Sequence, residues 1–526
     1  MKKIFLLSLF IFSITSFSQI LDTTFGINGT VFNTFNSAYS KITDIKILSD
    51  NKFITCGSTD VGTMAYISLC KFNENGTLDT SFGTDGKIIT NFSIPSNYYQ
   101  YTRDNHFPHL VIQPDNKIIV SGTNRNTSLV PTYDFGMIRY NPNGTLDTTF
   151  GANGVVMTDF NNLDDFCNSI TLQNDGQIVL VGETNTPIQG VNYGIIRYNS
   201  DGSLDLSFGN NGKISLDLSS NFYPYTSSSA TSVKIQSTGK IIIGGNCDKQ
   251  DIGNYTVQFA IVRLNSNGTL DTSFGINGQV FSLSTIGGIK QLTCLLIDNS
   301  DKIMAGGFDR IGSINTRKAL IQKYDENGNL DSSFANNGSF ITDEEKAIYE
   351  FSLQNDNKIL AVGFTSNPTG YHDYGYLIYR FNSDGTIDNS FGSNGMFTRN
   401  PNTGVYVEDQ AFAVAYQNNS SKIIIGGTSY SLNVLERYGN VVLSNTNLNS
   451  MLPFNLYPNP ANDVLKIQND TNYKIETFTI INVLGKKVLQ INDFDSEVNI
   501  QDLQKGFYIV EINSENKKFR LKFLKE

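Results

Sequence analysis

The sequence of 526 residues has no tryptophan, only three histidines and only 17% charged residues. Its 39 Lys and Arg residues stand against 49 Asp and Glu residues, which gives a net charge of −10. Because nucleic-acid binding needs clustered cations, this balance argues against a nucleic-acid partner. No hydrophobic run is long enough to cross a membrane as a helix, so no transmembrane segment is predicted.

Cysteine is also scarce, and the five residues Cys56, Cys70, Cys167, Cys247 and Cys294 follow no fixed spacing. An odd number without a pattern excludes a disulfide framework, and no structural zinc site is indicated. Cys56 and Cys70 are expected on neighbouring strands, so either a bridge between them or buried free thiols would fit. The sequence also lacks a Gly-x-Ser-x-Gly nucleophile motif and a phosphate-binding loop.

The first 18 residues have the pattern of a secretory signal peptide. Lys2 and Lys3 precede a short apolar run over residues 4–12, and small residues near Ser18 offer a cleavage site before Gln19. The mature protein is therefore expected to be exported.

What the sequence has in abundance is Gly (45), Phe (36) and Tyr (25), a composition typical of a secreted β protein. The motif Leu-Asp-x-x-Phe, followed by Asn-Gly or Asp-Gly, occurs seven times at intervals of 57 to 68 residues. The copies start at Leu21, Leu78, Leu146, Leu204, Leu270, Leu330 and Ile387. Such a period predicts a repeat architecture.

Each repeat contains four short β-rich segments, one of which is an apolar run that does not alternate, as in a strand buried on both faces. A Lys, or once a Gln, precedes this run, and a Gly lies five residues further on: Lys52/Gly57, Lys117/Gly122, Gln177/Gly182, Lys240/Gly245, Lys302/Gly307, Lys358/Gly363 and Lys422/Gly427. Four strands per repeat and seven repeats predict an all-β fold with a seven-bladed β-propeller.

A basic residue lies eight positions before the motif aspartate in six repeats, across a predicted turn, so an ion pair is expected in each repeat. These pairs are Lys71/Asp79, Arg139/Asp147, Arg197/Asp205, Arg263/Asp271, Lys323/Asp331 and Arg380/Asp388. Asp22 has no basic residue before it and Arg437 has no aspartate after it. We therefore expect Asp22 and Arg437 to form the seventh pair, with the N-terminal strand closing the last blade.

The repeat pattern stops after Tyr438. Residues 441–455 are predicted to be a polar linker, and residues 456–526 contain alternating apolar runs that predict a small Ig-like β-sandwich. The expected organisation is a signal peptide over 1–18, a propeller over 19–440, the linker over 441–455 and the sandwich over 456–526.

Two resemblances follow from these residues. The segment 456–526 resembles the type A sorting domain of the type IX secretion system of Bacteroidota, at Tyr457, Pro458, Asn459, Pro460, Gly485, Gly506 and Tyr508. This implies export across the outer membrane by the type IX secretion machinery, removal of the domain, and release or retention at the cell surface. The pattern Asn-x-Asp/Asn-Gly-x-Leu-Asp-x-x-Phe-Gly resembles the delta-60 repeat family, which implies the propeller fold and no particular activity.

Three groups of residues are candidates for chemistry. Asp325, Asn327, Asn329 and Asp331 offer alternate oxygens to calcium, but the spacing departs from an EF-hand and turn formation explains it as well. His106 and His109 lie in a predicted insertion, either as metal ligands or as solvated loop residues. Tyrosines of the insertions would either stack on sugars or peptide side chains or pack at the rim: Tyr98, Tyr99, Tyr101, Tyr371, Tyr374 and Tyr376.

The leading hypothesis is a non-enzymatic extracellular module that binds a glycan or a protein, without a cofactor. A secreted hydrolase or lyase with its site on one propeller face, and a structural component of the cell surface, are the alternatives. The seven equivalent aspartates do not form the asymmetric pair that a glycosidase needs. No catalytic, cofactor-binding or metal-binding residue is assigned.

Overall fold

Every regular element in the described part of the chain is a β-strand. The computed structural model describes residues 18–33, 35, 39–62, 64–95, 107–125, 132–187, 190–218, 227–251, 254–282, 288–310, 316–366, 374–399, 409–429, 432–441, 454–469, 474–482, 486–514 and 517–526. The chain divides into two compact units, Met1–Asn440 and Val441–Glu526. The described residues contain no helix long and apolar enough to cross a membrane.

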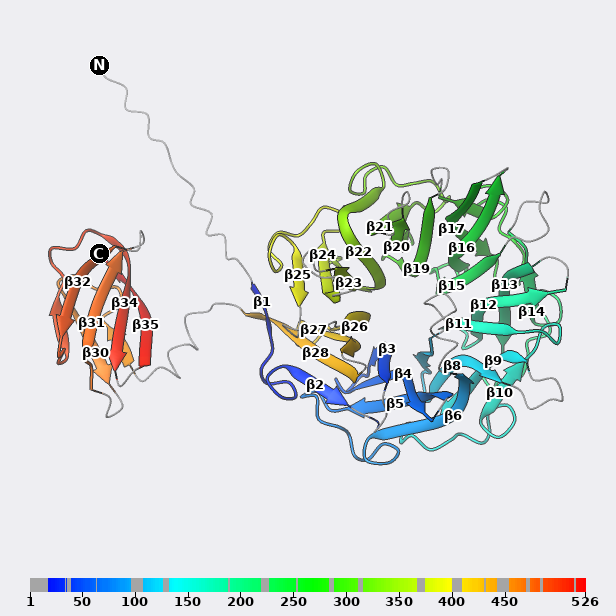
Figure 1. The fold of residues 1–526 in the computed structure, drawn as a ribbon, viewed down its shortest axis with the longest axis horizontal. Helices are drawn as coiled ribbons and strands as arrows, with labels where there is room; N and C mark the ends of the chain where they lie inside the picture. The colour runs from blue at the N-terminus through cyan, green and yellow to red at the C-terminus, as the bar shows by residue number, and fades with distance from the viewer. Residues whose placement is uncertain are drawn as a thin grey trace, which may run out of the picture. The chain divides into compact units, whose positions relative to one another are not determined.

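The first unit is a β-propeller of seven blades (Figure 1), as the repeats predict. The first blade contains β3 (Ser40–Ile47), β4 (Phe53–Val61), β5 (Met64–Phe72) and β6 (Lys87–Pro95). The second contains β7 (His109–Ile112), β8 (Ile118–Arg125), β9 (Tyr133–Tyr140) and β10 (Val155–Thr158). The third contains β11 (Asp165–Leu172), β12 (Ile178–Thr186), β13 (Gly190–Tyr198) and β14 (Lys213–Leu216).

The fourth blade contains β15 (Ser228–Ile235), β16 (Ile241–Asp251), β17 (Asn254–Leu264) and β18 (Gln279–Phe281). The fifth contains β19 (Ile289–Ile297), β20 (Ile303–Arg310), β21 (Arg317–Tyr324) and the first part of β22 (Ser339–Leu353). The second part of β22 begins the sixth blade, which continues with β23 (Ile359–Ser366), β24 (Tyr374–Phe381) and β25 (Met396–Arg399).

The seventh blade is built from both ends of the propeller segment. It contains β26 (Gln410–Gln417), β27 (Lys422–Ser429), β28 (Leu432–Val441) and β2 (Thr30–Asn33), with β1 (Ser18–Leu21) also paired to β28. The strands β2 and β28 are antiparallel, with Thr30 opposite Glu436 and Asn33 opposite Asn433. The expected closure by the N-terminal strand is therefore confirmed, and it covers a sheet edge that would otherwise be free to pair with other chains.

The non-alternating apolar runs are buried because each blade is packed on both faces. Ile241, Ile242 and Ile243 of β16 are all fully buried. Ile241 and Ile243 pack with residues of the third blade, whereas Ile242 packs with residues of the fifth. Successive side chains of a strand point to opposite faces, so one run of isoleucines joins three blades.

All five cysteines are buried free thiols. Cys56 of β4 lies opposite Leu69, and Cys70 of β5 lies opposite Thr55, so the two side chains are out of register. They belong to different core clusters. Of the two alternatives for this pair, the structure has the free thiols.

The second unit is a sandwich of two antiparallel sheets around one apolar core. One sheet contains β29 (Phe454–Tyr457), β30 (Val464–Asn469) and β33 (Glu497–Asn499). The other contains β32 (Lys487–Asn492), β31 (Thr477–Asn482), β34 (Gly506–Ser514) and β35 (Lys517–Lys525). Phe478 and Phe494 stack at 4.3 Å between ring centroids inside this core.

Candidate functional site

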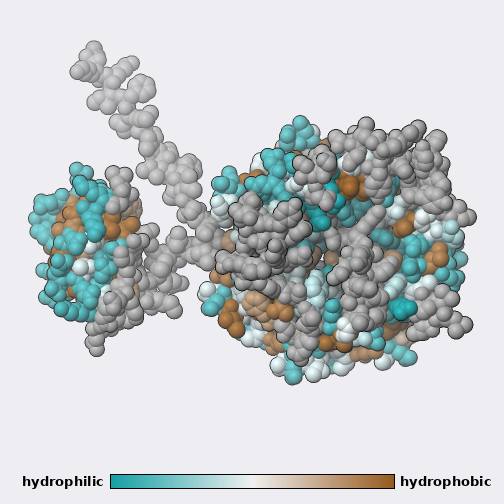
Figure 2. All heavy atoms as spheres, in the orientation of Figure 1, coloured by the Kyte–Doolittle hydropathy of each residue, from teal (hydrophilic) through white to brown (hydrophobic). Residues whose placement is uncertain are grey.

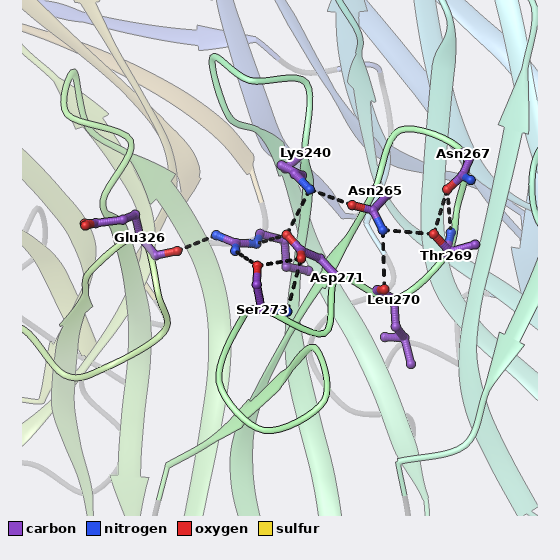
Figure 3. A network of polar contacts seen from close by, with 9 residues as sticks. Lys240, Asn265, Asn267, Thr269, Leu270, Asp271, Ser273 and Glu326 are labelled. Atoms are coloured by element: carbon purple, nitrogen blue, oxygen red, sulfur yellow. Dashed lines mark hydrogen bonds and ion pairs between the residues drawn. The ribbon is translucent and has the colours of Figure 1, made fainter.

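The Leu-Asp-x-x-Phe motif forms a polar network at the end of each blade, shown for the fourth blade in Figure 3. Asp271 Oδ2 forms ion pairs with Arg263 Nε at 2.8 Å and with Lys240 Nζ at 3.0 Å. Its other oxygen accepts the Ser273 hydroxyl at 2.7 Å and the Ser273 backbone N–H at 3.2 Å. We call this network, and its equivalents in the other blades, the clasp.

The predicted basic partner contacts the motif aspartate in six of the seven clasps. The distances from nitrogen to oxygen are 2.8 Å for Arg139–Asp147, 2.7 Å for Arg197–Asp205, 2.8 Å for Arg263–Asp271, 2.7 Å for Arg380–Asp388, 2.9 Å for Arg437–Asp22 and 3.8 Å for Lys71–Asp79. The pair between Arg437 and Asp22 joins residues that are 415 positions apart in the sequence.

The pair predicted between Lys323 and Asp331 is wrong. Lys323 Nζ binds Asp298 at 2.8 Å, and Asp331 is bound by Lys302 at 2.7 Å. The backbones still meet, because the Asp331 N–H donates to the Lys323 carbonyl at 2.8 Å. A lysine carries one compact ammonium group in place of the forked guanidinium of arginine, and in this blade Asp298 is the carboxylate that it contacts.

A second donor on each aspartate was not predicted. The Lys that precedes each buried apolar run, or Gln177 in the third blade, binds the motif aspartate in all seven blades. These contacts are Lys52–Asp79 at 2.9 Å, Lys117–Asp147 at 3.0 Å, Gln177–Asp205 at 2.9 Å, Lys240–Asp271 at 3.0 Å, Lys302–Asp331 at 2.7 Å, Lys358–Asp388 at 2.8 Å and Lys422–Asp22 at 2.8 Å. The recurrence of this Lys in the sequence was the available signal.

The clasp also joins each blade to the next one. Arg139 Nη1 donates to the Ser200 carbonyl at 2.6 Å, and Arg263 Nη1 donates to the Glu326 carbonyl. The guanidinium of each clasp arginine lies 4.3 to 4.7 Å from the ring centroid of the buried motif phenylalanine. The motif residue after this ring continues the contact, since the Gly275 N–H donates to the Asn327 carbonyl at 2.8 Å.

These contacts set the ionisation of the motif aspartates. For Asp271, burial alone would raise the pKa, but hydrogen bonds from Ser273 and Lys240 and the charge of Arg263 hold it well below its usual range. Hydrogen bonds from Ser81 and Lys52 lower the pKa of Asp79 to about 2. A carboxylate held this firmly in its ionised form is suited to structure and unsuited to acid–base catalysis near neutral pH.

The candidate calcium ligands around Asp325 are engaged within their own turn. Asp325 Oδ1 accepts the backbone N–H groups of Asn327 at 2.9 Å and Asn329 at 2.8 Å. Asp331 is bound by Lys302, as described above. The structure therefore uses these oxygens as turn and clasp acceptors.

The innermost strand of six blades carries a β-bulge at an equivalent position. The pairing with the second strand skips one residue in each case: Thr43, Asn168, Thr231, Thr293, Tyr349 and Phe412. A bulge leaves one residue unpaired and re-aims its side chain. Five of these residues, all except Asn168, line one cavity in the propeller channel.

Small polar side chains at the bulges connect neighbouring blades. Thr293 Oγ1 donates to the Ile348 carbonyl at 2.6 Å, and Thr231 Oγ1 donates to the Leu292 carbonyl at 3.1 Å. Asn168 Nδ2 donates to the Ala230 carbonyl at 2.9 Å. Blades six and seven differ, because their bulges hold the aromatic residues Tyr349 and Phe412.

The two aromatic bulges belong to an asymmetric part of the channel wall. The Phe412 ring lies 5.0 Å from Tyr349 and 5.4 Å from Phe107, measured between centroids. The same cavity is lined by Asp44, His109 and Glu350, which occupy equivalent positions on the innermost strands of blades one, two and six, directly after the bulge in blades one and six. We call these six residues, Phe107, Tyr349, Phe412, Asp44, His109 and Glu350, the channel arc.

The acidic end of the channel arc is ion-paired. Asp44 Oδ1 lies 2.5 Å from Lys46 Nζ, and Asp44 Oδ2 lies 3.6 Å from His109 Nδ1. Burial would raise the pKa of Asp44, but the charge of Lys46 and the hydrogen bond with His109 hold it below its usual range. The Lys46 side chain is 41% exposed.

The His and Tyr residues that were predicted to lie in insertions occupy different environments. His109 is the first residue of β7 and lines the channel, whereas His106 lies outside the described residues. Tyr376, predicted to be exposed, is fully buried and donates its hydroxyl to the Thr428 carbonyl at 3.3 Å, and Tyr374 is half-buried. Tyr98, Tyr99, Tyr101 and Tyr371 lie outside the described residues.

In the second unit, the Tyr457-Pro458-Asn459-Pro460 stretch joins the two ends of the sandwich. Asn459 Oδ1 accepts the backbone N–H of Leu524 at 3.0 Å. Tyr508 donates its hydroxyl to the Gln504 carbonyl at 2.9 Å and stacks on Phe523 at 5.6 Å. Gly506 is the first residue of β34, and Gly485 lies outside the described residues.

Comparison with known families agrees with this division. Residues 455–526 match the family described as a secretion system C-terminal sorting domain. The second unit is a sorting domain. Five segments of the first unit, 48–82, 113–150, 173–208, 236–274 and 354–391, match the family described as a domain of unknown function (DUF5122) beta-propeller. The sorting domain indicates export of the chain, to the cell surface or the medium, and implies contact with the secretion machinery.

No curated protein matches the chain in sequence. Among solved structures, the polysaccharide lyase Uly1 is similar with 10% identity and a TM-score of 0.44, over 78% of this chain and 92% of that one. Virginiamycin B lyase from Staphylococcus aureus has 11% identity and a TM-score of 0.39, over 77% and 98% of the two chains. Sqt1 from Chaetomium thermophilum has 12% identity and a TM-score of 0.40, over 79% and 100%. Likenesses at these values carry no argument about function.

Proposed function

We propose that the protein is a non-enzymatic binding module that captures an extracellular glycan or protein segment in its propeller channel. In this proposal residues 1–18 are removed as a signal peptide and the sorting domain delivers the propeller, residues 19–440, to the outside of the cell. The channel arc is the single observation that carries the proposal.

The clasp residues recur from blade to blade, whereas the residues of the channel arc differ between blades. Bulges that elsewhere hold small side chains bonded to the next blade hold Tyr349 and Phe412 in two adjacent blades. Aromatic faces beside paired charges are suited to a ligand that combines an apolar face with hydroxyl or amide groups, such as a sugar ring or a peptide side chain. Figure 2 shows hydrophobic residues among hydrophilic ones on the coloured part of the propeller face in view.

The test is a glycan array and a protein array probed with the purified exported protein and with the Phe412→Ala variant. We expect hits with the wild type that weaken at least tenfold in the variant, the size of effect that a central aromatic contact produces. Asn267→Ala, in an exposed clasp turn, is the matched control and should leave the hits unchanged. Hits that survive in Phe412→Ala would place the site elsewhere and refute the proposal.

A hydrolase or lyase is the second candidate, and the specific observation in its favour is the contact between Asp44 and His109 in the same cavity. A catalytic His needs an orienting carboxylate, and Asp44 is positioned to orient His109. Release of reducing ends or of unsaturated products from a panel of polysaccharides, lost in His109→Ala, would support this candidate. Ligands bound on the array and recovered intact after long incubation would count against it.

A further inference from the structure

Three aspartates meet between the second and third blades, away from the clasp. Asp134 of β9, Asp159 after β10 and Asp165 of β11 each place one carboxylate oxygen within 4.8 Å of the others. Asp134 and Arg139 lie at opposite ends of β9, about 17 Å apart at the rise of an extended strand. The cluster is therefore on the opposite side of the blade from the clasp.

Buried oxygen atoms without hydrogen-bond donors line this cluster. Asp165 is fully buried, and its Oδ1 atom has no hydrogen-bond partner among the described residues. Thr184 of β12 lies directly across from Asp165, and Asn192 of β13 lies directly across from Thr184, so the three side chains share one face of the blade. Thr184 Oγ1 and Asn192 Oδ1 are likewise buried without a hydrogen-bond partner in the described part of the chain.

Two further carboxylate oxygens of the cluster accept backbone N–H groups, and Asp134 Oδ1 accepts the Thr132 hydroxyl at 3.2 Å. Asp165 Oδ2 accepts the Phe160 N–H at 2.8 Å, and Asp159 Oδ1 accepts the Asn162 N–H at 2.7 Å. No Lys or Arg of the described residues forms an ion pair with Asp159 or Asp165. The nearby Lys213 donates to the Asp159 backbone carbonyl at 2.6 Å. The carboxylates of Asp159 and Asp165 are thus oriented, lie close to each other and form no ion pair with a described Lys or Arg.

Equivalent positions at other junctions do not concentrate acid. At the next junction, the positions of Asp134, Asp159 and Asp165 are occupied by Asn192, Asp217 and Ser228. At the junction between the fifth and sixth blades they are Lys318, Asp343 and Lys346, and Lys318 lies 3.8 Å from Asp343. The positions of Lys318 and Lys346 at that junction correspond to Asp134 and Asp165 at the junction between the second and third blades. The repeat therefore does not require three acidic residues at these positions.

From this geometry we propose that Asp134, Asp159 and Asp165 bind one calcium ion, with Thr184 and Asn192 as candidate further oxygen ligands, and that the ion ties the second blade to the third. Calcium takes six to eight oxygen ligands in flexible geometry, which suits carboxylates drawn from three separate strands, whereas magnesium demands a near-ideal octahedron. Extracellular calcium modules bind with dissociation constants of about 0.1 to 1 mM.

The test is isothermal titration of the chelator-treated full-length protein with CaCl2 and, separately, with MgCl2. We expect one calcium ion per chain in the range above and at least tenfold weaker magnesium binding. Asp159→Asn and Asp165→Asn should each weaken calcium binding at least tenfold. Asp159 is only half-buried, so its variant is expected to fold even if that of the buried Asp165 does not.

Asp217→Asn, at the equivalent position of the next junction, is the matched control. Asp325→Asn tests whether the turn around Asp325 binds calcium instead. Both should bind calcium as the wild type does. The proposal is overturned if the wild type binds no calcium at 10 times the upper end of that range, or if magnesium binds equally well. It is also overturned if Asp159→Asn is without effect, or if either control loses the ion.

Discussion

Replacing Asp22 should destabilise the propeller as much as breaking a clasp in the middle of the repeats. Asp22 accepts Arg437 at 2.9 Å, Lys422 at 2.8 Å and the Thr24 hydroxyl at 2.6 Å. The Asp22→Asn variant keeps the shape but removes the charge, so it weakens two charge-assisted hydrogen bonds, of which each contributes about 1.5–3 kcal/mol. Arg437, whose side chain is only 3% exposed, is then left with a neutral partner. We expect a loss of about 2–4 kcal/mol in the free energy of unfolding.

Differential scanning calorimetry of the exported protein measures the effect. An unfolding entropy of about 2.1 cal/mol/K per residue gives roughly 0.9 kcal/mol/K for a propeller of this length, so the melting temperature should fall by about 2–4 °C. Asp271→Asn, which loses the same set of donors inside the chain, is the matched control and should give the same decrease. A double-mutant cycle of Asp22→Asn with Arg437→Gln should show a coupling energy of about 1–3 kcal/mol. Closure by the N-terminal strand is refuted if Asp271→Asn lowers the melting temperature and Asp22→Asn leaves it unchanged.

Three further predictions follow from the clasps and the sorting domain. The pKa of Asp79 and that of Asp331 are lowered to about 2. A carboxylate whose pKa is lower in the folded state than its unfolded value near 4 stabilises the fold above that value, and this stability is lost as the pH falls through the folded pKa. Acid titration monitored by circular dichroism should therefore show stability lost between about pH 4 and pH 2, and a transition confined to pH 5–7 would contradict this. Gln177→Lys supplies the charge that the other six blades have, so thermal unfolding should show a gain of up to about 1 kcal/mol, and a decrease would show that the third blade is adapted to the neutral partner. Deleting residues 455–526 should keep the protein inside the cell in fractionation blots, and normal surface or medium levels of the truncated chain would argue against the sorting role.

The fold was predictable because the motif recurs in every repeat with a fixed spacing between its basic and acidic residues. The eight-residue offset between base and acid across a turn gave five of the seven ion pairs, and the two residues that it left unpaired, Asp22 and Arg437, gave the pair that joins the two ends of the propeller. The failure at Lys323 has a local cause, because Asp298 competes for a single ammonium group and nothing in the offset reveals that competitor. The Lys before each apolar run was visible as a recurrence, but its target aspartate lies 27 to 31 positions away in the first six blades and 400 positions away in the seventh, and only the folded sheets bring the two together.

The channel arc was not predictable in the same way. Its aromatic members sit at β-bulges, and a one-residue bulge reverses which side chains face the channel without leaving a mark in local composition. Thr43 and Tyr349 each precede the Gly of their repeat, Gly57 and Gly363, by 14 residues, so aligning the repeats on that Gly would have exposed the replacement of Thr by Tyr. The three aspartates between the second and third blades were hidden for a related reason, since they come from three strands and two blades.

We propose that the clasps stabilise the propeller and that the channel arc binds the ligand. The most direct test measures the dissociation constant of the array-selected ligand for Asp271→Asn and Phe412→Ala side by side, at a temperature where both variants are folded. The claim predicts that Asp271→Asn binds as tightly as the wild type although it melts earlier, whereas Phe412→Ala binds at least tenfold more weakly. Equal weakening in both variants, or loss of binding in Asp271→Asn alone, would contradict it.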